Sequence, residues 1–194
     1  MGIVFGIGSY EEPKFEKQKV DGAFEIRKYH PNIVAEVTVE GSMDEASSKG
    51  FRLIANYIFG GNVSTNGGKG ESIAMTAPVV MKPAVSESIA MTAPVVLQPA
   101  GGTDVFSESK LWKIQFVMPS SYSLDTLPTP NNAAVKLLEA PGKLCGAVSF
   151  SGWWTEVATN QQTTLLRQWL QTHGYTVIGE PQLLRYNPPW LVAP

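Results

Sequence analysis

Apolar and polar residues alternate along the segment FEIRKYHPNIVAEVTVE, residues 24–40, and this pattern predicts β-structure. One face of its second part is apolar throughout: Ile33, Ala35, Val37 and Val39. The dipeptide His30-Pro31 interrupts the segment, so we expect two strand pieces with a break between them. Further strands are predicted for LWKIQFVMP, which ends at Pro119, and for YTVIGEPQLLRY near the end of the chain.

Two segments have the period of an amphipathic helix. The first follows a capping box, Ser42 with Glu45 three positions later, and runs to Gly60-Gly61. The second runs from about Thr155 to His173 and ends at a glycine. Its predicted apolar face consists of Val157, Leu165, Leu166, Trp169 and Leu170.

These elements fall into two similar halves, at about 20–119 and 131–194, within a single domain of 194 residues. The turn-rich segment PSSYSLDTLPTPNN separates them. In the second half, AAVKLLEA and LCGAVSF flank Pro141-Gly142 and predict a hairpin. Two strand–helix–strand halves predict an α+β domain with a mainly antiparallel, curved sheet.

The decapeptide ESIAMTAPVV occurs twice, at 71–80 and again at 87–96. Its IAMTAPVV part has no titratable side chain, so it cannot act as an acid, a base or a charged ligand. The proline in each copy favours a strand end, an edge or a bulge, and we interpret the repeat as a duplicated edge strand. Met75 and Met91 are then expected to pack against apolar side chains. The alternative is that these methionines line an adaptable apolar pocket.

Composition excludes several classes of protein. With 43% hydrophobic and 16% charged residues the chain is globular, and a net charge of −2 favours neither nucleic acid nor an anionic membrane surface. The single cysteine, Cys145, excludes an internal disulfide and favours a reducing, cytoplasmic location. No apolar run approaches the ~20 residues of a membrane span, and the N-terminus is not expected to be a signal peptide.

No catalytic or metal site is predicted, so we do not expect an enzyme. The segment GGKGES resembles a phosphate-binding loop, but Val63 and Gly70 stand where that loop needs glycine and serine or threonine. His173 is expected at a helix end, where the helix dipole favours a cation. His30 is expected to be an exposed turn residue.

The segments FEIRKYHP, IAMTAPVV, VMPSSY and RYNPPW resemble, in this order, the SOUL/heme-binding protein family. Plant and algal members are especially similar because they have tandem blocks of the IAMTAPV type. The resemblance covers nearly the whole chain. It implies a distorted β-barrel of two pseudo-symmetric halves with two main α-helices. It also implies a monomer that binds haem or another tetrapyrrole reversibly, without catalysis, as a carrier, buffer or sensor; other proteins are further candidate partners.

The resemblance places the tetrapyrrole in a cleft beside the first helix, near the YNPP loop. The matching positions are Ser48, Phe51, Arg52, Ala55 and Tyr186. The four helical positions share one face, and the other face is assigned to the core: Met43, Ala46, Gly50, Leu53 and Tyr57. Phe51 offers an aromatic plane to the macrocycle, and Arg52 suits a propionate. An ordinary exposed helix face is the alternative interpretation.

Two further points bear on the ligand. Where a family member is proposed to have an axial histidine, this chain has Lys28, and His30 comes two residues later. Binding through the apolar surface of the macrocycle, without a histidine ligand, is therefore expected. The alternative function is a small-molecule effector-binding domain or ligand hydrolase of the gyrase-inhibitor-like fold. A hydrolase needs a buried carboxylate, for which Glu25, Glu36 and Glu156 are candidates. An interaction module using Trp153-Trp154 is a third possibility.

Overall fold

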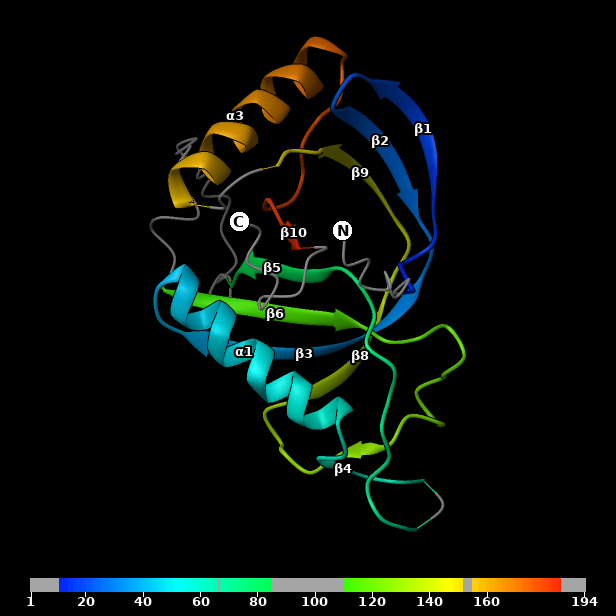
Figure 1. Cartoon of the computed structure of the whole chain (residues 1–194). Helices are drawn as coiled ribbons and strands as arrows, with labels where there is room; N and C mark the ends of the chain where they lie inside the picture. Colours follow the sequence, from blue (N-terminus) through cyan, green and yellow to red (C-terminus); the bar gives the residue numbers. More distant parts are fainter. Residues whose placement is uncertain (1–10, 66, 85–109, 152–154, 186–194) are drawn as a thin grey trace, which may run out of the picture.

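The computed structural model describes residues 11–65, 67–84, 110–151 and 155–185 (Figure 1). This part of the chain contains two helices, α1 (Met43–Ile58) and α3 (Glu156–Thr172). The strands are β1 (Phe15–Asp21), β2 (Phe24–Tyr29), β3 (Asn32–Glu40), β4 (Asn62–Val63), β5 (Val79–Pro83), β6 (Leu111–Val117), β7 (Thr129–Pro130), β8 (Lys136–Ala140), β9 (Lys143–Val148) and β10 (Leu183–Arg185). All pairings between these strands are antiparallel, which confirms the α+β class with two helices.

The strands form three hydrogen-bonded sheets rather than the closed barrel that we expected. The described residues give a five-stranded sheet of order β10-β5-β6-β3-β8, a three-stranded sheet of order β1-β2-β9 and the small pair β4-β7. The two larger sheets meet where β2 turns into β3 and β8 turns into β9. Pro31 lies at this corner and has no N–H group to donate, so the hydrogen-bond ladder stops on both sides of it.

The segment around Pro141-Gly142 is part of this corner and not the predicted hairpin turn. Strands β8 and β9 pair with β3 and β2 respectively, and the structure gives no pairing of β8 with β9. Gly142 packs against the other side of the corner, because a Cβ atom there would lie 2.9 Å from the carbonyl oxygen of Tyr29. The Pro141-Gly142 pair therefore bends the chain from one sheet into the other and does not fold β9 back against β8.

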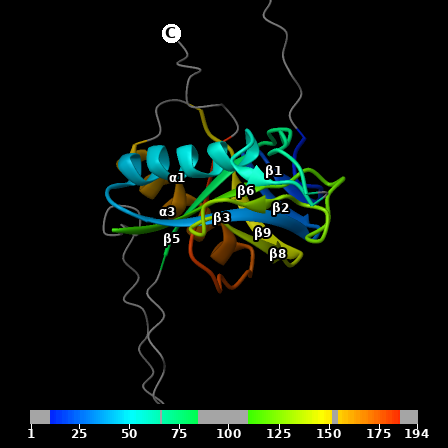
Figure 2. The ribbon, with the colours of Figure 1, turned by 90° about the horizontal axis from the view of Figure 1, so that it is seen from below.

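Helix α1 covers one face of the five-stranded sheet, above β3 and β6 (Figure 2). The alternation predicted for β3 is confirmed, since Ala35, Val37 and Val39 are buried towards the helix. The core between helix and sheet also contains Met43, Ala46, Ile54, Tyr57, Ile58, Trp112, Ile114 and Phe116. Four of the five residues assigned to the core face of the helix are buried, and Leu53 is half-buried at its margin.

Helix α3 packs against β9, with Leu170 over Gly146 and the indole of Trp169 stacked on Phe24 at a centroid distance of 5.3 Å. The predicted apolar face is only partly right, because Val157 and Leu165 are 66% and 48% exposed. The last predicted strand is also shorter than expected, since only Leu183–Arg185 pairs with β5. Neither helix in the described part of the chain is long and apolar enough to cross a membrane.

The first copy of the repeated decapeptide, residues 71–80, supplies the first two residues of β5, Val79 and Val80, and the segment that leads into them. Ile73 is buried, and Met75 is half-buried against the core, as predicted. Strand β5 lies between β6 and β10, so the interpretation of this copy as an edge strand is wrong. The second copy, with Met91, lies outside the described residues.

Candidate functional site

Helix α1 positions four of the five residues predicted to contact a ligand. The capping box that begins the helix is present: the Ser42 N–H donates to Oε2 of Glu45 at 3.0 Å, and the Glu45 N–H donates to Oγ of Ser42 at 3.4 Å. These contacts hold the pKa of Glu45 below its usual value. The cap sets where the first turn starts and therefore which residues face the sheet.

The predicted positions occupy the margin and the solvent side of α1. Ser48 and Arg52 are exposed, whereas Phe51 and Ala55 are half-buried. The ring of Phe51 lies on Phe116 of β6, with centroids 5.3 Å apart. The Phe51 side chain is therefore packed on the core and is only partly reached by solvent. Tyr186 lies outside the described residues.

Arg185 of β10 is a residue of this region that the sequence analysis missed. Its Nη1 donates to Oγ of Ser47 on α1 at 3.0 Å. Burial lowers the pKa of Arg185, and Asp44 opposes that effect. Arg185 is paired with Val79 of β5, which is in turn paired with Phe116. Its position directly before Tyr186 in the RYNPPW segment was the feature of the sequence that could have identified Arg185 as a candidate.

We call the residues at this side of α1 and on the adjoining strands the helix margin: Ser48, Phe51, Arg52, Ala55, Val79 and Arg185. An aromatic ring and a half-buried valine provide apolar area, and two guanidinium groups stand beside it. Such a surface can accept a flat apolar molecule that has carboxylate groups at its edge.

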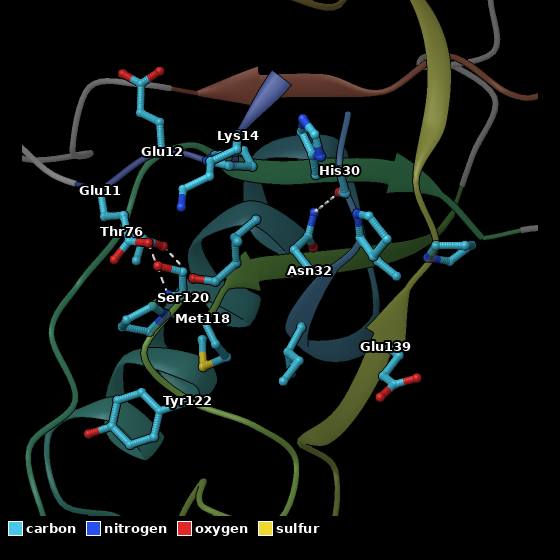
Figure 3. A pocket seen from close by; sticks show the side chains of 17 residues that line it. Glu11, Glu12, Lys14, His30, Asn32, Thr76, Met118, Ser120, Tyr122 and Glu139 are labelled. Atoms are coloured by element: carbon cyan, nitrogen blue, oxygen red, sulfur yellow. Dashed lines mark hydrogen bonds between the residues drawn. The ribbon is translucent and has the colours of Figure 1, made fainter. Parts of the chain in front are cut away.

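A separate cavity of about 490 Å³ opens at the corner between the two larger sheets (Figure 3). It is lined by the β2–β3 connection around His30 and Asn32, by the end of β6 with Met118 and Ser120, and by residues 11–14. Its charged groups are the carboxylates of Glu11, Glu12 and Glu139 and the cations or potential cations of Lys14 and His30. None of the predicted helix positions lines this cavity.

Two charged groups of this cavity have partners within the protein, whereas the buried Oδ1 of Asn32 has no hydrogen-bond partner among the described residues. Glu11 accepts the Ser120 N–H at 2.9 Å, and hydrogen bonds from Ser120 lower the pKa of the Glu11 carboxyl. His30 is half-exposed, as predicted, and its Nε2 lies 3.4 Å from Oε1 of Glu16 on β1. The carboxylates of Glu11, Glu12 and Glu139 are all exposed to solvent.

The three carboxylates proposed for a hydrolase are dispersed. Glu25 accepts hydrogen bonds from Lys17 at 2.7 Å and Arg27 at 2.6 Å, and the hydrogen bond from Lys17 is the main cause of its lowered pKa. Glu36 is buried on β3 and accepts from Gln115 at 2.5 Å. Glu156 begins α3.

The remaining expectations concern metals, His173 and the tryptophan pair. In the part of the chain that is described, no three His, Cys, Asp or Glu side chains are grouped as a metal site would require. His173 caps α3, with Nδ1 at 2.8 Å from the carbonyl oxygen of Trp169, as its sequence position predicted. Trp153 and Trp154 lie outside the described residues.

Comparison with known proteins gives a family match over nearly the whole chain. A sequence model of the SOUL heme-binding protein family matches residues 10–88 and 82–194, and each range includes one copy of the repeated decapeptide. A search of curated proteins gave no match.

Two solved structures from Listeria innocua are similar. An uncharacterized conserved protein is 13% identical, with a TM-score of 0.50 over 86% of this chain and 83% of the other. A hydrolase is 12% identical, with a TM-score of 0.44 over 78% and 74%. At this identity the first comparison supports the fold alone.

Proposed function

The chain belongs to the SOUL heme-binding protein family, and on this premise we propose that it binds haem or a related tetrapyrrole reversibly and without catalysis. A carrier, a buffer and a sensor would all use such binding. We further propose that residues 1–194 act as one monomeric domain in the cytoplasm. The pairing of β3 with β8 and of β5 with β10 supports one domain, because it joins the two halves.

The observation that carries the proposal is the half-buried ring of Phe51 on α1, in a helix margin that also has two arginines. Arg52 follows it on α1, and Arg185 reaches α1 from β10 through Ser47. Adjacent helix residues diverge by about 100°, so Phe51 would lie under the macrocycle while Arg52 meets a propionate at the rim. Propionates stay ionised and hydrated there, and a guanidinium pairs with a carboxylate in a two-pronged geometry.

The residues present fit a tetrapyrrole held by its apolar surface and its carboxylates. The helix margin has no histidine among its described members, so the chain itself would orient the macrocycle through stacking and ion pairing. When bound, haem would supply its own iron chemistry. The surrounding residues would contribute orientation and partial exclusion of water.

Haemin titration of single variants tests this proposal. We expect Phe51→Ala to weaken binding by on the order of 1–3 kcal/mol through lost apolar burial and stacking. Arg52→Ala should cost less, about 0.5–1.5 kcal/mol, as is usual for a partly exposed charged contact. A porphyrin that lacks propionates should be insensitive to Arg52→Ala and still sensitive to Phe51→Ala. Quenching of tryptophan fluorescence and the Soret band provide the measurement.

A matched control is Leu165→Ala, which truncates an exposed apolar residue on the other helix and should leave haemin affinity unchanged. Because Phe51 also packs on Phe116, the thermal stability of each variant is measured alongside. An unchanged haemin affinity in a folded Phe51→Ala protein would move the site away from α1. Equal losses of both porphyrins in Arg52→Ala would mean that Arg52 supports the fold instead.

The effector-binding or hydrolase alternative has less support in the described residues. Its candidate carboxylates do not converge, and Glu25 is held ionised by two cations. Failure of haem, protoporphyrin and a bilin to bind would nevertheless favour that alternative.

A further inference from the structure

Two lysines face each other on the side of the five-stranded sheet that α1 does not cover. Lys82 of β5 and Lys113 of β6 are direct partners in the antiparallel register. Their neighbours Met81 and Trp112 are buried in the core beneath α1. Because successive strand residues point to opposite faces, both lysines point away from the helix. Directly opposed residues have Cβ atoms roughly 5 Å apart, so the two ammonium groups share one region.

The negative charge near this pair is limited. Lys113 Nζ lies 3.5 Å from Oε1 of Glu36, whose other oxygen is occupied by Gln115. Lys82 makes no hydrogen bond or ion pair with any residue in the described ranges, although it is only half-exposed. Glu36 therefore balances one of the two lysines.

A third lysine reaches the same region from the other large sheet. Lys143 of β9 donates to Oε1 of Gln182 at 2.9 Å. Gln182 directly precedes β10, which is the neighbour of β5. The charge of Lys143 acts on Lys82, as does that of Lys113. The charges of Lys113, Lys143 and Glu36 therefore all act on Lys82, and Glu36 is the one carboxylate among them.

Folding alone does not account for this arrangement. Burial lowers the pKa of Lys82, Glu36 opposes this effect, and Lys143 and Lys113 lower the pKa further. Like charges directly opposite each other in a sheet are destabilising, and burying an unpaired charge adds to that cost. A bound anion would offset both the repulsion between the lysines and the cost of burying the unpaired charge of Lys82.

We propose that Lys82, Lys113 and Lys143 bind a compact dianion of the phosphate class, either free phosphate or a phosphate monoester. A phosphate group has a charge of about −1.5 to −2 near neutral pH, which matches two uncompensated ammonium groups. Lysine binds phosphate as a point charge and needs no planar geometry. The site lies on the opposite face of the sheet from α1 and is independent of tetrapyrrole binding.

Thermal unfolding of the whole protein in phosphate, compared with sodium chloride at the same pH and ionic strength, tests the proposal. Phosphate should raise the melting temperature saturably, and Lys82→Gln should weaken the apparent phosphate affinity at least tenfold. Lys49→Gln is the matched control, because it removes the same charge from the exposed side of α1. Phenyl phosphate is tested in parallel: binding tighter than that of phosphate assigns the site to monoesters, and weaker binding assigns it to the free anion.

Equal melting temperatures in phosphate and chloride would overturn the proposal, because the lysines would then be neutralised within the chain. The same conclusion follows if Lys82→Gln responds to phosphate as the wild type does, or if Lys49→Gln loses the response equally. Should Lys82→Gln fail to fold, Lys113→Gln takes its place with the same expectation.

Discussion

Glu25 is a buried carboxylate on β2 that is held between two cations. Lys17 Nζ and Arg27 Nε lie 2.7 Å and 2.6 Å from its oxygens, and Arg27 also lies over the ring of Phe15 at 4.7 Å. The hydrogen bond from Lys17 lowers the pKa of Glu25 more than burial raises it. Glu25 therefore joins β1 to β2 through ionic contacts that require its charged form.

The protonation of Glu25 should make stability depend on pH. Since its pKa is lower in the folded than in the unfolded chain, its contribution is present above the unfolded pKa and is lost as the pH falls towards the folded one. Glu25→Gln should reduce the free energy of unfolding at pH 7 by roughly 1–3 kcal/mol, the usual range for hydrogen bonds to a charged group. Urea denaturation between pH 7 and pH 3 should also show a weaker acid dependence in this variant.

Glu40→Gln, which removes an exposed carboxylate at the end of β3, is the control for that series. Identical pH dependence of the wild type and Glu25→Gln would show that the pairs of Glu25 contribute nothing net to folding.

His30 should not be required for haem binding. It belongs to the cavity at the sheet corner, is half-exposed and lies 3.4 Å from Glu16. The helix margin includes neither His30 nor any other described histidine. His30→Ala should therefore keep the Soret shift and the haemin affinity to within about twofold. Loss of both would identify His30 as an axial ligand and would place the macrocycle at the corner cavity.

At the scale of elements, each helix approaches its sheet over a glycine. Gly50 of α1 lies on Ile114 of β6, and a Cβ atom there would be 2.8 Å from the isoleucine Cβ. On the other side, Gly146 of β9 lies beneath Leu170 of α3, where the added atom would meet Leu170 Cδ2 at 2.7 Å. Close contact of helix and sheet in both halves thus depends on a missing side chain.

The two glycines should differ in how well they tolerate alanine. The side chain of Ile114, which faces Gly50, is β-branched and has little rotamer freedom. Gly50→Ala must therefore push α1 away from the sheet, at a cost of about 1–3 kcal/mol. The terminal methyl groups of Leu170 can rotate aside, and Gly146→Ala should cost less. Chemical denaturation measures both values. A larger loss in Gly146→Ala would mean that α3 is held more rigidly than α1.

Elements with local signals were predictable, and those with distant partners were not. The starts of α1 and α3 were predicted correctly from Ser42 with Glu45 and from Thr155, because an N-cap depends only on residues within one turn. The hairpin predicted at Pro141-Gly142 was wrong, because a hairpin turn and a bend between two sheets use the same residue types. Only the partner strands, which are far away in sequence, decide between the two.

The candidate site shows the same limit. The family resemblance selected Phe51 and Arg52, and their spacing predicted that they lie side by side because both are on one helix. Arg185 could not be placed on α1, because it contacts Ser47 across 138 positions and no local pattern encodes that contact. Its partnership depends on the whole course of the chain.

In the whole molecule, strands of the second half complete the two larger sheets that strands of the first half begin. Strand β8 extends the sheet of the first half, β9 pairs with β2, and β10 completes the five-stranded sheet beside β5. Neither half has a complete sheet of its own, so we expect them to unfold together. Unfolding monitored at β1–β2–β9 and at α1 should therefore give one coincident transition.

The position of β10 has a consequence during synthesis. Leu183 pairs with Met81, about 100 residues earlier, so β5 has no neighbour on that side until Leu183–Arg185 have left the ribosome. Until then, the strand Val79–Pro83 is an open edge of the kind that recruits other nascent chains. A chain ending after Glu180 should accordingly aggregate more than the full chain, as seen by light scattering. Val80→Lys should suppress that aggregation, because a charge on an open edge opposes pairing with another strand.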